Sequence, residues 1–192
     1  MNSFGRTRLS AEEWDLWWDN ERTPRLVGDV EERKFCDQIG PASGTVAVDI
    51  GCGNGHWTRM HAVGYDFSPA AIDQARAAGT HSRLRYDLWD VEADSIPRGI
   101  RPGSIDVVTC RDSLAFLDRE RFLTDVRRWL RPKSGALYVI TKADSVDAEY
   151  QQSDPFERGL TQDEIDRLRD GWTYSTTYTV GPRTAVVLRG PA

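Results

Sequence analysis

Short apolar runs alternate with amphipathic segments along most of the chain. The runs at residues 45–50, 105–110 and 136–141 are typical of buried strands, and residues 84–90 form a further predicted strand. Between them, apolar residues recur at helical spacing, most clearly over residues 118–130. Strands that are apolar on both faces and alternate with helices predict a parallel sheet covered on both sides.

Capping residues set the ends of the predicted helices. Ser10 with Glu13 forms a capping-box pattern that begins a helix over 10–20. Ser68 as the N-cap and Gly79 as the stop delimit another helix. The remaining predicted helices span residues 29–39, 118–130 and 161–171.

The last part of the chain departs from the alternating pattern. Two β-rich runs, residues 172–180 and 184–189, flank the tight turn at 181–183 and predict a hairpin. The hairpin adds antiparallel strands to the sheet. The predicted fold class is therefore α/β: a doubly wound, mostly parallel, seven-stranded sheet with an antiparallel C-terminal hairpin strand.

Three glycines stand at alternate positions in DIGCGNG, residues 49–55, directly after the first predicted strand. Glycine there costs backbone entropy and packs nothing, so the backbone must bend tightly and admit a close approach. In doubly wound sheets, ligands bind beyond the carboxyl ends of the strands. The turn is therefore a candidate ligand site, although an ordinary glycine-rich turn is the competing interpretation.

Two acids follow the neighbouring predicted strands. Asp66 ends the second strand, where its carboxylate can accept both hydroxyls of a ribose. Asp90 ends the third strand, where it can accept the amino group of an adenine, with the Val91 amide beside it. Together with the glycine turn, these acids predict an adenosine pocket.

The spacing of the glycines favours a ligand without phosphate. The dinucleotide fingerprint is GxGxxG, whereas this chain has GxGxG followed by His56. Asp66 comes fifteen residues after Gly51, fewer than the ~20 of that fingerprint. No GK[ST] follows, so the phosphate-binding Walker pattern is absent.

Five segments in register resemble the class I S-adenosylmethionine-dependent methyltransferases. VDIGCGNG resembles their motif I, and the others are GYDFSPAAIDQAR, LWDVEADSIP, GSIDVVTCRDSLAFL and FLTDVRRWLRPKSGALYVIT. The resemblance covers residues 45–190. It implies an S-adenosylmethionine-binding methyltransferase domain over residues 45–192, preceded by an N-terminal helical lid over 1–44, with S-adenosylhomocysteine as the product.

The resemblance also implies roles for particular residues. The methionine part of the cofactor would lie on Asp49 and the glycine turn, the ribose on Asp66, and the adenine between Phe67 and the Asp90–Val91 segment. Cys110 and Arg111 would border the methionine part and its methyl group. The implied cofactor-binding residues are Asp49, Gly51, Cys52, Gly53, Asn54, Gly55, Asp66, Phe67, Asp90, Val91, Cys110 and Arg111.

The implied reaction is transfer of a methyl group to an oxygen or nitrogen of a small-molecule or peptide acceptor. A net charge of −5 disfavours nucleic acid as the partner. Only ten residues separate Gly55 from Asp66, a short crossover that keeps open a non-catalytic or repurposed domain of the same fold. A nicotinamide oxidoreductase is disfavoured by the glycine spacing and the terminal hairpin.

The acceptor side of the site is less defined. The helical face of Trp14, Trp17 and Trp18 either closes on a flat acceptor or packs its helix onto the sheet. Arg111 either binds a substrate carboxylate or pairs with Asp112, and the loop at 144–160 is a predicted substrate wall. The candidate bases, none of which stands out, are His56, His61, Asp112 and Tyr150.

The amino-acid composition predicts the cellular compartment of the protein. The three cysteines, Cys36, Cys52 and Cys110, form no CxxC and predict reduced thiols in a cytoplasmic protein. The first residues lack the apolar core of a signal peptide, and no apolar run approaches the ~18 residues of a membrane span. No residue cluster has metal-ligand spacing, so no metal is expected.

Overall fold

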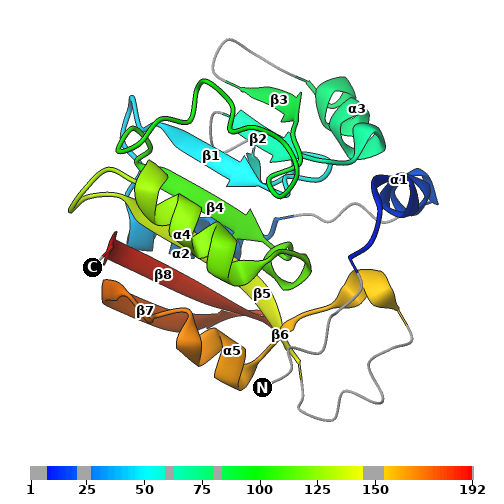
Figure 1. Cartoon of the computed structure of the whole chain (residues 1–192). Helices are drawn as coiled ribbons and strands as arrows, with labels where there is room; N and C mark the ends of the chain where they lie inside the picture. Colours follow the sequence, from blue (N-terminus) through cyan, green and yellow to red (C-terminus); the bar gives the residue numbers. More distant parts are fainter. Residues whose placement is uncertain (1–7, 21–26, 59–62, 80–83, 145–153, 192) are drawn as a thin grey trace.

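The structure, a computed structural model, describes residues 8–20, 27–58, 63–79, 84–144 and 154–191. Its centre is a twisted sheet with the strand order β3-β2-β1-β4-β5-β8-β7, and the short β6 pairs with β5 (Figure 1). The strands are β1 Ala47–Ile50, β2 Val63–Asp66, β3 Arg85–Leu88, β4 Val107–Arg111, β5 Ala136–Asp144, β6 Leu160–Thr161, β7 Trp172–Val180 and β8 Arg183–Pro191.

The pairing of the strands confirms the predicted fold class. Strands β1 to β5 run parallel, so the carboxyl ends of β1, β2 and β4 meet at one edge of the sheet. Strand β8 is antiparallel to both β5 and β7 and lies between them. The register that pairs Ile140 with Ala185 continues to Lys142 and Arg183, which brings the hairpin turn beside the carboxyl end of β5.

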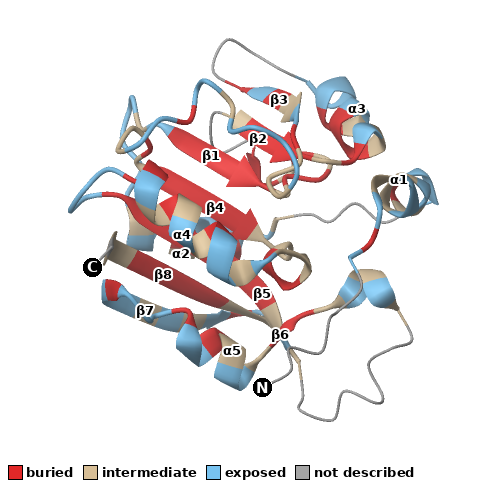
Figure 2. Cartoon of the chain, in the orientation of Figure 1, coloured by how far each residue is buried: buried red, intermediate tan, exposed pale blue. Residues whose placement is uncertain are grey.

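Helices border the sheet on both faces. The helices are α1 Ala11–Asn20, α2 Asp29–Ile39, α3 Pro69–Ala77, α4 Arg119–Trp129 and α5 Gln162–Arg167, with single 3-10 turns η2 Leu114–Phe116 and η4 Pro155–Glu157. Alternate residues of β4 face opposite layers: Val108 belongs to the same buried cluster as Trp129 of α4, and Val107 belongs to the cluster that contains Phe35 of α2. The central strands are consequently buried along their length (Figure 2).

Local capping signals in the sequence match the observed helix starts. Ser68 Oγ accepts a hydrogen bond from the Ala71 amide at the start of α3. The Thr161 and Glu164 side chains form the reciprocal capping box of α5. In the first crossover, the described residues 51–58 form turns and no α-helix, and the remaining positions 59–62 lie outside the described residues.

Candidate functional site

The glycine turn after β1 adopts a conformation that only glycine takes readily. Gly51, Gly53 and Gly55 have φ values of +70°, +54° and +79°. The amides of Gly51 and Cys52 both donate to the Tyr65 carbonyl of β2, 2.8 and 3.0 Å away, which fixes the turn at the carboxyl edge of the sheet.

The positions that a Cβ would take at these glycines are occupied by the protein's own side chains. A Cβ on Gly51 would lie 2.3 Å from Ser113 Oγ, and a Cβ on Gly53 would lie 2.6 Å from the Trp18 ring. A Cβ on Gly55 would lie 2.5 Å from the Tyr86 hydroxyl. Close approach therefore does require glycine here, but the approaching groups come from the η2 region, α1 and β3.

Asp66 lies against this turn, as its position in the sequence predicts. One carboxylate oxygen accepts from the Gly53 amide at 2.8 Å and the other from the Ser68 amide at 3.0 Å. The side chain is buried, and burial raises the pKa of Asp66 while these amide hydrogen bonds oppose the rise. The end of β2 thus places a buried acid against the glycine turn that follows β1.

Asp49, at the end of β1, is a second buried acid in the same place. It accepts hydrogen bonds from the Thr58 hydroxyl at 2.5 Å and the Thr109 hydroxyl at 2.8 Å. Burial raises the pKa of Asp49 to about 6, although both hydroxyls and the Arg111 charge lower it. Burial therefore destabilises the ionised form of Asp49, and a nearby cation would reduce that destabilisation.

The raised pKa of Asp49 predicts how stability changes with pH. The folded pKa of about 6 exceeds the ordinary 3.8, so the stabilising contribution is complete below pH 4 and is lost as the pH rises through 6. Asp49→Asn should remove this contribution. Urea unfolding of both proteins at several pH values should show a slope difference approaching one proton between about pH 4 and 6. Parallel pH profiles would contradict the assignment.

One cavity brings most of the predicted cofactor residues together. Its lining includes the glycine turn and acids at or after the ends of four strands, together with Trp14 and Trp18 of α1. The predicted cofactor residues that line it are Asp49, Gly51, Cys52, Gly53, Asn54, Asp66, Phe67, Asp90, Val91 and Arg111. Gly55 instead contacts Tyr86, and Cys110 is fully buried in the core beneath α4.

Asp90, beyond β3, carries an ion pair that the sequence did not indicate. Its Oδ1 accepts from the amides of Glu92 and Ala93, at 2.9 and 3.2 Å, and Arg8 donates to its Oδ2 at 2.6 Å. Although partial burial raises it, the Arg8 contact and these amides together hold the pKa of Asp90 below its usual value. The Arg8 guanidinium also lies 5.4 Å from the centre of the Phe67 ring.

An aromatic cluster contributes to the wall of the cavity, and its members are Trp14, Trp17, Trp18, Phe116 and Phe156. Trp14 meets Phe116 edge-on at 5.0 Å and Phe156 at 4.9 Å, while Trp17 stacks on Phe156 at 5.8 Å. Trp14, Trp18 and Phe116 line the cavity. Trp14 and Trp18 thus pack α1 against neighbouring residues and also line the cavity, while closure of this face on an acceptor stays a prediction.

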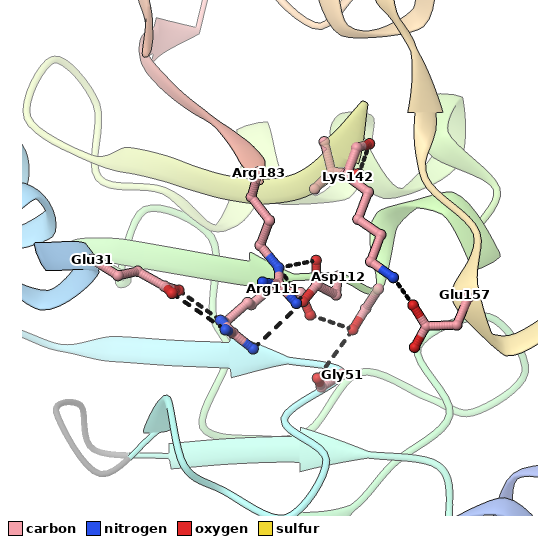
Figure 3. Close-up of polar contacts among 9 residues, drawn as sticks. Glu31, Gly51, Arg111, Asp112, Lys142, Glu157 and Arg183 are labelled. Carbon is pink, nitrogen blue, oxygen red and sulfur yellow. Dashed lines mark hydrogen bonds and ion pairs between the residues drawn. The ribbon is translucent and has the colours of Figure 1, made fainter. Parts of the chain in front are cut away.

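Four charged side chains contact one another in series beside the end of β4 (Figure 3), and two of them, Arg111 and Asp112, line the cavity. Arg111 donates to Glu31 of α2, with Nε 2.6 Å from Oε1, and its Nη1 lies 3.5 Å from Asp112. Arg183 of β8 donates from Nε to both Asp112 oxygens at 2.8 and 2.9 Å. Arg111 therefore pairs mainly with Glu31, a residue that sequence reasoning did not select.

The candidate bases are only partly placed. His56 and Asp112 both line the cavity, and Asp112 takes the left-handed φ of +55°, which is uncommon for a residue with a side chain. His61 and Tyr150 lie outside the described residues. Of the predicted substrate wall at 144–160, residues 145–153 lie outside them too, but Phe156 contacts the aromatic cluster and Glu157 pairs with Lys142 (Figure 3).

Neither a metal cluster nor a membrane span occurs in the part of the chain that the structure describes. None of the His, Cys, Asp and Glu side chains there gather in threes as candidate metal ligands. No helix among the same residues has the length and apolar character needed to cross a membrane.

Comparison with known proteins gives a consistent family signal. A family model described as a methyltransferase domain matches residues 48–139. The ubiquinone biosynthesis O-methyltransferase of Cupriavidus pinatubonensis is 28% identical over 134 residues, which are 65% of this chain and 53% of that enzyme. The counterpart from Pseudomonas aeruginosa is 26% identical over 134 residues. The matched region thus spans about half the length of these curated relatives.

Solved structures share the fold at low sequence identity. An S-adenosylmethionine-dependent methyltransferase from Mesorhizobium loti has a TM-score of 0.64 and 19% identity, covering 84% of this chain and 98% of its own. The Haemonchus contortus phosphoethanolamine N-methyltransferase 2, solved with S-adenosyl-L-methionine, has a TM-score of 0.70 and 14% identity, covering 97% of this chain and 59% of its own. At such identities the likeness concerns the fold.

Proposed function

This chain belongs to the class I S-adenosylmethionine-dependent methyltransferases, and from that premise we propose that it transfers the methyl group of S-adenosylmethionine to an oxygen or nitrogen of a small-molecule acceptor. The observation that carries the proposal is the meeting of Asp66, Asp49 and the glycine turn at one cavity. The acids come from adjacent parallel strands, which places them where this fold binds ligands.

The residues at the cavity fit a cationic adenosyl ligand. Asp66 has its carboxylate at the turn and lines the cavity, which supports assigning the ribose to it, and the Asp90–Val91 segment lines the same cavity, which supports assigning the adenine edge to it. Asp49, a buried acid with a pKa of about 6, gains most from a cation such as the ammonium or sulfonium of this cofactor. A ligand with phosphates would instead meet the four carboxylates in the lining, which outnumber its two guanidinium groups.

When bound, S-adenosylmethionine supplies an activated methyl group, so the chain's own residues have to align the acceptor and exclude water. Trp14, Trp18 and Phe116 offer flat apolar walls on the acceptor side. Asp112 and His56 are the described polar groups there that could accept a proton from a hydroxyl or amine. The O-methyltransferase relatives support a small acceptor of this kind.

Replacing Asp66 tests the cofactor site. Asp66→Ala should weaken binding of S-adenosylhomocysteine by about 1.5–3 kcal/mol, the range for hydrogen bonds to a charged group. Isothermal titration calorimetry on the full chain measures this, and circular dichroism checks that the variant is folded. The matched control is Asp87→Ala, because Asp87 lies on the neighbouring β3 with its side chain 48% exposed, outside the cavity. Equal affinity in Asp66→Ala and wild type would refute the ribose assignment.

The short crossover at residues 56–65 favours one alternative, a domain that binds S-adenosylmethionine without transferring its methyl group. An assay with labelled cofactor distinguishes a methyltransferase from a domain that only binds the cofactor. It measures release of S-adenosylhomocysteine in the presence of phenol, catechol and amine libraries. Turnover with any acceptor supports the enzyme. Cofactor binding without turnover across the libraries supports the alternative.

A further inference from the structure

Arg8 contacts both groups that are assigned to the adenine of the cofactor. Its guanidinium donates to Asp90 Oδ2 at 2.6 Å and lies over the Phe67 ring, 5.4 Å from the ring centre. Asp90 is the predicted acceptor of the adenine amino group, and Phe67 is the predicted stacking partner of the adenine ring. Arg8 and Leu9 also line the cavity. An arginine therefore stands in the part of the cavity that the family fold gives to a nucleobase.

A guanidinium and an adenine can make the same kinds of contact with Asp90 and Phe67. Both are flat, both donate hydrogen bonds from an N–H in their plane, and both stack on an aromatic face. The other Asp90 oxygen, Oδ1, is already taken by the Glu92 and Ala93 amides, so Oδ2 is the oxygen left for a ligand. Adenine and Arg8 would then require the same oxygen and the same ring face.

We propose that Arg8 is a competing occupant of the adenine subsite, a latch that must leave Asp90 Oδ2 when the adenine of the cofactor binds. The proposal rests on the proposed function, because it takes the adenosyl group as the ligand. It assigns Arg8 a part in setting cofactor affinity.

The surroundings of Arg8 allow this exchange without moving α1. Leu9 is buried, and Asp15 of α1 accepts from the Ser68 hydroxyl at 2.5 Å and the Ala70 amide at 3.0 Å, so the helix stays docked on α3. The Arg8 side chain itself is 43% exposed. Only a long, flexible side chain has to move.

Glu92 gives the displaced guanidinium a second partner. Its carboxylate lies 3.0 Å from Arg8 Nε, whereas Asp90 is contacted through a different nitrogen, Nη2. Arg8 can thus release Asp90 and keep one ion pair. Partly exposed ion pairs contribute little each, so the penalty that the latch places on cofactor binding is modest.

The test compares wild type with Arg8→Ala, using S-adenosylhomocysteine and adenosine as probes in calorimetric titrations of the full chain. Arg8→Ala should bind both probes about 1.5- to 5-fold more tightly, because adenine no longer has to displace an ion pair of that strength. Adenosine has no methionine part, so an equal gain for both probes places the effect at the adenine. The gain should shrink in the Asp90→Asn background, where the pair is already broken. Arg33→Ala, at an exposed position on α2, is the charge-matched control and should change neither affinity.

The outcomes separate the latch from the proposed function. Unchanged or weaker binding of either probe by Arg8→Ala would overturn the latch, and weaker binding would make Arg8 a supporting wall of the site. If neither wild type nor Arg8→Ala binds S-adenosylhomocysteine, the proposed function and the latch both fail. Binding by wild type with no gain in the variant refutes the latch alone.

Discussion

Replacing Arg111 by methionine is expected to lower the free energy of unfolding by about 3–5 kcal/mol, because it leaves the buried Glu31 carboxylate without its cation. The Arg111 and Glu31 side chains are only 10% and 7% exposed, and their charged atoms lie 2.6 Å apart. Urea denaturation followed by tryptophan fluorescence measures the loss.

The matched control removes both charges at once. The double variant Glu31→Leu/Arg111→Met should recover most of the lost stability, because a buried ion pair can often be replaced by apolar side chains at little net cost. Arg131→Ala breaks the more exposed pair with Asp106, whose side chains are 49% and 28% exposed, and should cost about 1 kcal/mol or less. A single Arg111→Met variant as stable as Arg131→Ala would contradict the view that the Glu31–Arg111 pair is buried and mutually dependent.

Gly51→Ala is expected to cost about 2–4 kcal/mol of stability, from left-handed backbone strain and overpacking together. Gly51 has φ of +70°, and the new methyl group would lie 2.3 Å from Ser113 Oγ. The turn would have to shift away from η2, and with it the amide hydrogen bond from Gly53 to Asp66. Thermal unfolding and S-adenosylhomocysteine titration should therefore both report the change.

The control variant Gly40→Ala separates the cost of backbone strain from the cost of overpacking. Gly40 ends α2 with a similar φ of +60°, but no atom lies within 4 Å of the place a Cβ would take, so alanine there should cost only about 1 kcal/mol of backbone strain. Adding Ser113→Gly to Gly51→Ala should return the part of the loss that is due to the clash. Equal losses in Gly51→Ala and Gly40→Ala would show that the turn has room for a side chain.

The elements that could be predicted from sequence are those with local causes. The Ser10–Glu13 pattern does form a reciprocal cap, with distances of 2.7 and 3.2 Å. The alternation of strands and helices predicted the parallel sheet, and the turn at residues 181–183 predicted the antiparallel hairpin. Strand β5 continues to Asp144, past the predicted end at residue 141, because it pairs there with β6 and the start of β8. That extension depends on partners far along the chain.

In the candidate site, too, the features with local causes could be predicted from sequence and those that depend on distant partners could not. Glycine spacing and the strand-end acid predicted the turn and Asp66, since each lies at the end of its own strand, whereas Asp49 was implied only by the family resemblance. The partners of Asp90 and Arg111 could not be predicted, because Arg8 and Glu31 lie 82 and 80 residues away and nothing near them in sequence marks them. The aromatic cluster illustrates the same division. The spacing of Trp14 and Trp17 predicted that they share one helical face, but nothing in the sequence predicted that this face contacts Phe156.

The position of β8 between β5 and β7 has a consequence for how the sheet assembles. Strand β7 emerges from the ribosome before β8, and among the described strands its sheet neighbour is β8, which follows it after a two-residue turn. The two strands can therefore pair first as a local hairpin, whereas the edge of β5 stays unpaired until β8 joins it, and that pairing is a step of high contact order that favours slow closure. Because Arg183 is the first residue of β8, the same closure also delivers the cation that holds Asp112, so this wall of the cavity is completed among the last events of folding.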